Sequence, residues 1–163
     1  MKPTERTANL ITMLGQADDY HDPCPGREHI TGLEHALRPA LMMEQRTADP
    51  QLHLAAIVHD LARPLNDVYH GEIVAEIVRD RVHPAVYHLL RTHGEYQDAV
   101  VHHHAYPKQP AAVLEECQPH NLQKLALMFA ACEAMTFDPE WDYPAERWTY
   151  ARARDLILQQ LGD

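Results

Sequence analysis

The chain has 163 residues and a formal net charge of −10 at pH 7, which argues against nucleic-acid backbones as partners because binding them depends on neutralising phosphates. No apolar run approaches the roughly 20 residues that span a bilayer, and the first residues lack the apolar stretch of a signal peptide. Three cysteines without a CxxC pair fit a reducing compartment, so we expect a cytoplasmic protein with no membrane partner and, from its length, a single domain over residues 1–163.

The first half of the chain shows the spacing of amphipathic helices, in which apolar residues recur at i, i+3, i+4 and i+7. This spacing predicts helices over residues 4–17 and 29–47. Asp49 and Pro50 form an N-cap and first-turn pair, which opens a third helix running to about Ala62.

The second half continues the same pattern. Residues 70–82 carry one apolar stripe, and Pro84 starts the next helix, for which Gly94 predicts the C-terminal end. Asn121 caps a further helix, and Pro144 begins the last one. The sequence therefore predicts an all-α fold, a bundle of five to seven helices around one core.

A histidine and an aspartate occupy a position where an ordinary core would place leucine or valine. In a helix, Leu52, Ala55, Ala56 and His59 share one face. This directs His59, with the carboxylate of Asp60 beside it, toward the interior. Burying an ionised carboxylate is very costly unless it is paired or bound to a metal. The pair therefore favours a metal site.

Further candidate ligands lie on, or at the edge of, other helices with apolar stripes: His35, His70, His93 and Glu133. Adjacent helical residues point about 100° apart, so His59 suits one metal while Asp60 bridges to a second. Imidazole and carboxylate ligands without thiolate favour Fe, Mn, Zn, Co or Mg.

Each of these ligands has a structural alternative. His70 could cap its helix or lie at the surface, and Glu133 could lie in an exposed turn. The candidate that competes with His93 is the triplet at 102–104, which could also line the mouth of a pocket or be solvated. A second His-Asp dipeptide occurs at His21 and Asp22. About one such dipeptide is expected by chance in a chain of this composition, so this one is not a candidate site.

Taken in order, these segments resemble the HD-domain superfamily of metal-dependent phosphohydrolases and its diiron oxygenase branch. The resemblance covers about residues 20–142, and its matching segments are 33–37, 56–62, 70–75, 89–94 and 133–139. It implies an HD-type helical bundle with a metal site in the core.

The resemblance also implies the number of metal ions. Mononuclear members use the first histidine, the His-Asp pair and a distal carboxylate, whereas dinuclear members add two intervening histidines, which match His70 and His93. The pattern is similar to that of phosphonate-cleaving diiron oxygenases and inositol oxygenase, and also of dinuclear phosphodiesterases. It implies two metal ions, here iron, held by His35, His59, Asp60, His70, His93 and Glu133.

Several positions bear on the substrate. Tyr20 and Glu28 resemble the tyrosine and glutamate of the oxygenases' active-site loop, so both are candidate catalytic residues together with the bridging aspartate. Glu133 replaces the usual distal aspartate. Gln97 and Ala130 stand where phosphonate oxygenases have a substrate-binding lysine and an arginine, so phosphonate is not the expected substrate.

Three residues are candidates for binding the substrate. Arg63, one turn after His59, could hold a carboxylate or phosphate by a bidentate fork, or could form a surface salt bridge. Gln97 and His103 are the other two.

Three functions remain open from the sequence. The first is a diiron oxygenase that breaks a C–H bond of a small polar or anionic metabolite. The second is a phosphohydrolase of nucleotides or phosphate esters, in which Mn, Co or Ni lowers the pKa of a bound water. The third is a metal- or ligand-binding protein without catalysis. The expected partner is a small-molecule substrate, and a homodimer is compatible with the sequence.

Overall fold

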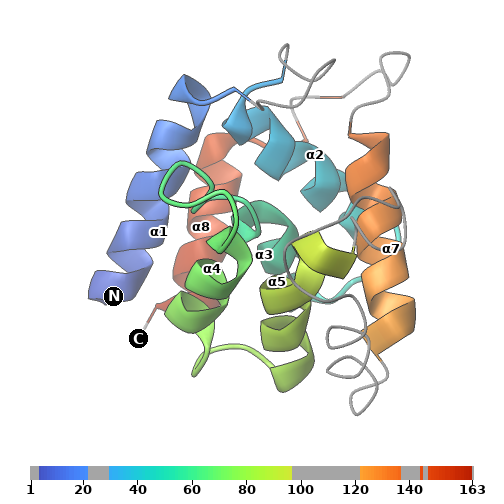
Figure 1. Ribbon diagram of the computed structural model, residues 1–163. Coiled ribbons are helices and arrows are strands. Elements are labelled where there is room, and N and C mark those ends of the chain that lie inside the picture. Colours follow the sequence, from blue (N-terminus) through green and yellow to red (C-terminus); the bar gives the residue numbers. More distant parts are fainter. Residues whose placement is uncertain (1–3, 22–29, 97–121, 137–143, 145–146, 163) are drawn as a thin grey trace.

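A computed structural model of the chain describes residues 4–21, 30–96, 122–136, 144 and 147–162. Their regular structure is helical apart from one isolated bridge between His21 and Thr31, which confirms the all-α class. The elements are α1 (Glu5–Gln16), the 3₁₀ turn η1 (Ala17–Asp19), α2 (Gly32–Glu44), α3 (Pro50–Val58), α4 (His70–Val78), α5 (Pro84–Tyr96), α7 (Leu122–Met135) and α8 (Tyr150–Leu161) (Figure 1).

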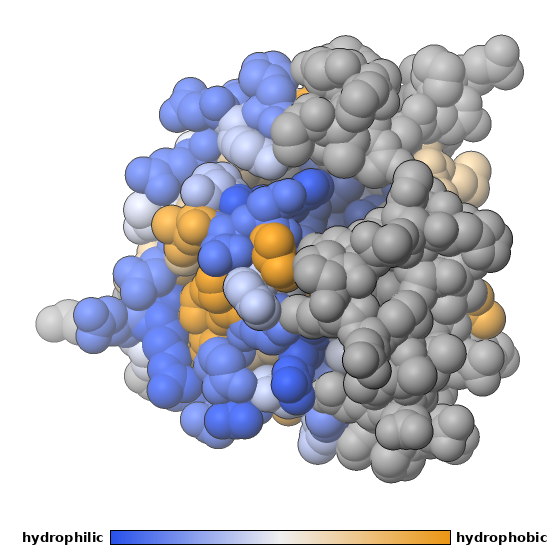
Figure 2. Space-filling model, in the orientation of Figure 1, coloured by the Kyte–Doolittle hydropathy of each residue, from blue (hydrophilic) through white to orange (hydrophobic). Residues whose placement is uncertain are grey.

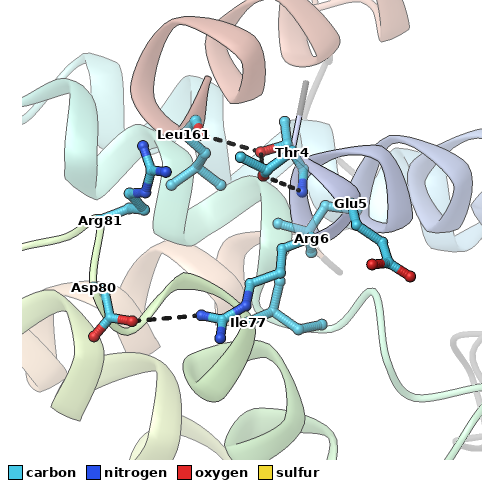
Figure 3. Close-up of a pocket in the computed structure, with 9 residues that line it drawn as sticks. Thr4, Glu5, Arg6, Ile77, Asp80, Arg81 and Leu161 are labelled. Atoms are coloured by element: carbon cyan, nitrogen blue, oxygen red, sulfur yellow. Dashed lines mark hydrogen bonds and ion pairs between the residues drawn. The ribbon is translucent and has the colours of Figure 1, made fainter. Parts of the chain in front are cut away.

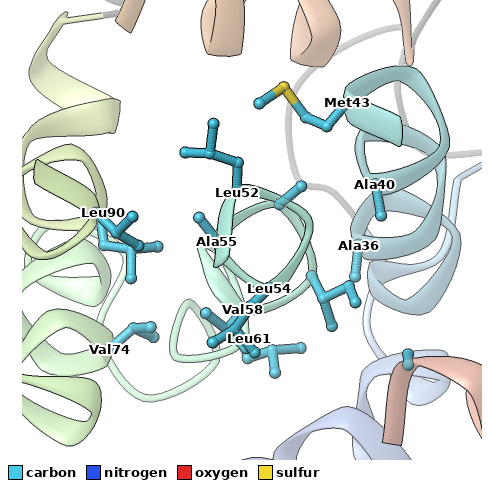
Figure 4. Close-up of a cluster of buried hydrophobic side chains, with 14 of the residues drawn as sticks. Ala36, Ala40, Met43, Leu52, Leu54, Ala55, Val58, Leu61, Val74 and Leu90 are labelled. Carbon is cyan, nitrogen blue, oxygen red and sulfur yellow. The ribbon is translucent and has the colours of Figure 1, made fainter. Parts of the chain in front are cut away.

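Helix α3 lies at the centre of the molecule and packs against α2, α5 and α8. Its residues from Leu54 to Val58 are fully buried, so the single inward face predicted for this helix was too narrow. A helix that is apolar all round belongs inside a protein. Figure 4 shows Leu52 and Ala55 of α3 between Met43 of α2 on one side and Leu90 of α5 on the other.

The other helices surround α3 as neighbouring pairs. Helix α1 packs against α8, α4 against α5, and α7 against both α5 and α2. The first turn of α1 is tied to the end of α8, because the Thr7 hydroxyl donates to the Leu161 carbonyl at 3.1 Å.

Capping residues mark the starts of two helices, α3 and α8. Asp49 Oδ1 accepts from the backbone N–H of Gln51 at 2.9 Å, as an N-cap should, and Pro50 takes the first position of α3. The last helix begins at Tyr150 with Thr149 as its N-cap, so the prediction that it starts at Pro144 was wrong.

Three predicted helix ends were also wrong. Helix α3 ends at Val58 rather than Ala62, because the backbone N–H groups of Leu61 and Arg63 bond carbonyls three residues back, at 3.2 and 2.9 Å, in a tighter turn. Helix α4 ends at Val78 rather than at residue 82. Helix α5 runs through Gly94 to Tyr96, so this glycine does not end it.

The surface is mostly hydrophilic where the face in Figure 2 is described, and its apolar areas there are small and separate. Within the described residues, no helix combines the length and the apolar character needed to cross a membrane.

Candidate metal centre

The structure brings together the six residues that the sequence singled out as ligands. They come from the first turn of α2, the end of α3, the start of α4, the last turn of α5 and the last turn of α7: His35, His59 with Asp60, His70, His93 and Glu133. They form two groups that could each hold a metal ion. Site A consists of His35, His59, Asp60 and Glu133, and site B of Asp60, His70 and His93.

Site A consists of two imidazoles and two carboxylates, all buried except for the partly exposed Asp60. The Nε2 atoms of His35 and His59 are 3.1 Å apart, and Glu133 Oε1 lies 3.7 and 3.8 Å from them. Asp60 Oδ2 lies 3.1 Å from His35 Nε2. Two nitrogens bound at about 2.1 Å to one ion, at a right angle, are about 3.0 Å apart, so this spacing fits a shared metal.

Site B has the same spacing with fewer groups. The Nε2 atoms of His70 and His93 are 3.1 Å apart, and Asp60 Oδ1 lies 2.9 and 3.2 Å from them. Asp60 therefore directs one carboxylate oxygen toward the histidines of site B and the other toward His35 of site A.

Hydrogen bonds to the far side of three rings fix how the imidazoles face. In each case the Nδ1–H donates to the carbonyl three residues earlier, at 2.9, 2.8 and 2.7 Å, for the pairs His59–Ala56, His70–Asp67 and His93–Leu90. A carbonyl can only accept, so a neutral ring then carries its lone pair on Nε2. Facing lone pairs at 3.1 Å repel unless a cation or a proton lies between them. Each pair of rings could therefore hold a metal ion or share a proton.

Glu133 supports the same interpretation. Its side chain is buried, and its Oε2 atom has no hydrogen-bond partner among the described residues. Burial alone would raise the pKa of Glu133, but the hydrogen bond and charge of His59 hold that pKa at about 2. A buried carboxylate that stays ionised needs a cation beside it.

The carboxylates and the histidines of the centre shift one another's pKa values. Burial alone would lower the pKa of His59, but the charges of Asp60 and Glu133 raise it to about 9. Burial would likewise lower the pKa of His70, and its hydrogen bond to Asp60 raises it. Burial would raise the pKa of Asp60, whereas His59 and the other three histidines hold it well below its usual range. Without a metal, protons therefore occupy the place of the cation.

Two further residues hold the ligands in place. Phe129, one turn before Glu133, packs edge-on against the ring of His59 with the centroids 5.3 Å apart. Arg38 Nη1 donates to the Thr136 carbonyl at 3.0 Å, which ties α2 to the end of α7. Sequence reasoning missed Arg38, because its only signal was its spacing of three residues from His35, and such spacings are common.

A small cavity reaches the centre beside His35 and Asp60, and Tyr20, Gly32 and Arg63 also line it. Its volume of about 20 Å³ is roughly that of one water-sized sphere. Tyr20 and Arg63, two of the residues expected around a substrate, therefore lie next to site A.

Arg63 is held between two carboxylates. It donates to Asp60 Oδ2 at 3.1 Å and to Asp67 Oδ1 at 3.0 Å. The Arg63 side chain is 14% exposed, whereas that of Asp67 is 64% exposed, so Arg63 forms a salt bridge at the surface as well as one with Asp60. Its positive charge lies directly beside the centre.

A larger cavity lies elsewhere, between the start of α1, the end of α4 and Leu161 (Figure 3). Its volume is about 440 Å³, and Arg6 and Asp80 form an ion pair there at 3.5 Å. None of its lining residues belongs to site A or site B.

Three predicted site residues lie outside the described residues: Glu28, Gln97 and His103. The whole triplet at 102–104 does so too, and within the described part of the chain it is His93 that joins site B.

No protein-family model matches the chain, and no curated protein matches it. The chemistry of the centre must therefore be inferred from its own residues.

Proposed function

We propose that this protein is an HD-type dinuclear metalloenzyme that oxidises a small polar or anionic substrate with molecular oxygen, using iron as its resident metal. The proposal is supported chiefly by Asp60, which belongs to two ligand groups and directs a different oxygen to each. A bridging carboxylate of this kind suits two ions, because one ion would need only one of the groups.

The donor set is compatible with iron, as it is with Mn, Zn, Co or Mg. All six groups are imidazoles or carboxylates, and no thiolate belongs to either group. Two bound irons would supply the redox chemistry by which oxygen is activated for cleavage of a C–H bond. The protein then has to bind the ions, orient the substrate and exclude water.

The two sites differ in the number of protein donors. Site A has four groups and site B has three, so site B keeps more positions for a small exogenous ligand. Metal sites with three protein ligands and an open position are typical of catalysis.

The residues around the cavity would orient the substrate. Arg63 brings a guanidinium next to Asp60, which suits an anionic group on the substrate. Tyr20 lines the same cavity, where its hydroxyl would donate to or accept from a substrate oxygen. The rings of Phe129 and His93 lie edge-on to the ring of His59, where they would exclude water from that ring.

The second candidate is a metal-dependent phosphohydrolase, and the position of Arg63 favours it. A guanidinium beside metal dications also suits a phosphoryl group. In that case a metal-bound water would be the nucleophile, and no oxygen would be consumed.

Metal analysis of the purified protein tests the proposal. The wild type should bind two irons per chain, His70→Ala should keep one, and Asp60→Ala should lose both. A wild type that binds only one ion, or an Asp60→Ala variant that keeps two, would contradict a bridged pair.

Turnover assays separate the two reactions. Iron-loaded protein is given a panel of polyols and hydroxy acids in an oxygen electrode, and manganese-loaded protein is given p-nitrophenyl phosphate and bis-p-nitrophenyl phosphate. Substrate-dependent oxygen uptake supports the oxygenase. Phosphate ester cleavage without oxygen uptake supports the hydrolase, and neither activity in a metal-loaded protein supports a non-catalytic role.

A further inference from the structure

Gly71 follows His70 in the first turn of α4 and is buried against α5. A Cβ atom at this position would lie 2.7 Å from the carbonyl oxygen of Leu90 and 3.2 Å from Cε1 of His93. The first of these contacts is with a backbone atom, so no change of side-chain rotamer could relieve it. Any larger residue at position 71 would therefore push α4 and α5 apart.

The carbonyl of Leu90 is also the group that orients His93. It accepts the Nδ1–H of that ring at 2.7 Å, and this bond directs Nε2 toward His70. A side chain at position 71 would thus strike both the imidazole and its acceptor.

The two sites depend on different helices. His70 and His93 of site B lie on α4 and α5, whereas site A takes its other donors from α2, α3 and α7. Asp60 alone is common to both. Helix α5 also packs against α3 and α7, whereas α4 packs mainly against α5. A movement of α4 away from α5 would therefore change the donor spacing in site B and leave the spacing in site A.

We propose that Gly71 is a positioning residue that makes site B possible by letting α4 and α5 approach within ligand distance. The inference rests on the proposed dinuclear centre. Ligand distances in metal sites are held within about 0.2 Å, so the few tenths of an ångström that a Cβ demands are enough to lose the second ion. Gly71 acts through the acceptor and the ring of His93, and need not touch metal or substrate.

The test is a titration of the metal-free protein with Mn²⁺, in which binding is measured by calorimetry and the coupling of the bound ions by electron paramagnetic resonance. The wild type should bind two ions that show exchange coupling. Gly71→Ala should bind one uncoupled ion, with affinity for the second reduced at least tenfold, as His70→Ala should. The matched control is Gly15→Ala on α1, where the added Cβ would meet its nearest neighbour, Tyr150 Oη, at an ordinary 3.6 Å, and it should keep both ions.

The outcomes separate this inference from the proposed function. A wild type without two coupled ions overturns the dinuclear centre itself. A coupled pair in Gly71→Ala, with the wild type also coupled, overturns only the role of Gly71. If Gly71→Ala fails to fold under conditions in which His70→Ala folds and has lost the second ion, the inference is overturned, because Gly71 would then serve folding rather than site B.

Discussion

Glu133 is longer by one methylene than the aspartate that the resemblance leads us to expect at its position. Its Oε1 atom lies 3.7 and 3.8 Å from the Nε2 atoms of His35 and His59, whereas Asp60 Oδ2 lies 3.1 Å from His35. The carboxylate of Glu133 is thus farther from the imidazole nitrogens of site A than the carboxylate of Asp60 is from His35.

Shortening this side chain should weaken site A. Glu133→Asp would withdraw the carboxylate by about one C–C bond, roughly 1.5 Å, beyond what a ligand distance tolerates. Loss of an outer partner alone weakens metal binding 10–100-fold, so we expect at least a tenfold loss, measured by competition with a chelator. Glu76→Asp, on the exposed side of α4, is the control and should bind metal like the wild type. Unchanged binding by Glu133→Asp would show that Glu133 is not a ligand.

The clustering of the candidate ligands could be predicted from the sequence because each is a polar group on, or at the edge of, a helix with an apolar stripe. Burial of His35, His59, His70, His93 and Glu133 follows from that pattern, and all five are buried. Arg38 and Gly71 could not be predicted in the same way. Arg38 bonds a carbonyl 98 residues away, and Gly71 matters only because of what α5 places opposite it.

At the scale of elements, periodicity located the helices but not their ends. The start of α2 follows from a capping box, in which Thr31 Oγ1 accepts from the N–H of Glu34 and the Glu34 carboxylate accepts from the N–H of Thr31, at 3.2 and 3.3 Å. This Thr-x-x-Glu spacing is legible in the sequence, whereas periodicity placed the start at residue 29. The end of α3 at Val58 has no such signal, since the turn after it depends on where His59 and Asp60 must point.

The capping box gives a test of whether the centre and the helix that carries His35 are energetically separate. Thr31→Ala removes one cap and should lower the free energy of unfolding by about 1 kcal/mol, measured by urea denaturation of the metal-free protein. Thr12→Ala, on an exposed face of α1, should change it by less than about 0.5 kcal/mol. Both variants should keep the metal stoichiometry of the wild type. Loss of an ion in Thr31→Ala would show that the cap positions His35.

At the scale of the whole molecule, helices far apart in sequence bring four imidazoles and two carboxylates to one place at the end of α3. In the metal-free protein this is held by charge, because the raised pKa of His59, about 9, lets a protonated ring neutralise the carboxylates. A bound metal would replace that proton. Proton and metal therefore stabilise the same centre under opposite conditions of pH.

The sign of the pH dependence follows from the shifts. The pKa of His59 rises from 6.5 to about 9 on folding, so its contribution is complete below pH 6.5 and disappears as the pH rises through 9. The pKa of Glu133 falls from 4.5 to about 2, so its contribution is complete above pH 4.5 and disappears as the pH falls through 2. From these two groups, the metal-free protein should be most stable between about pH 4.5 and 6.5.

Metal binding should show the opposite trend above pH 6.5, because imidazoles must lose their protons to become ligands. We expect the free energy of unfolding of chelator-treated protein to fall by up to about 3 kcal/mol between pH 6.5 and 9, as measured by urea denaturation. Over the same interval the extra stability given by a fixed concentration of Mn²⁺ should grow. His53→Ala provides the control, because this ring bonds the Thr47 carbonyl outside the centre, and the fall should remain in that variant. Metal-free stability that stays level or rises across this interval would mean that protonated His59 does not hold the carboxylates in place.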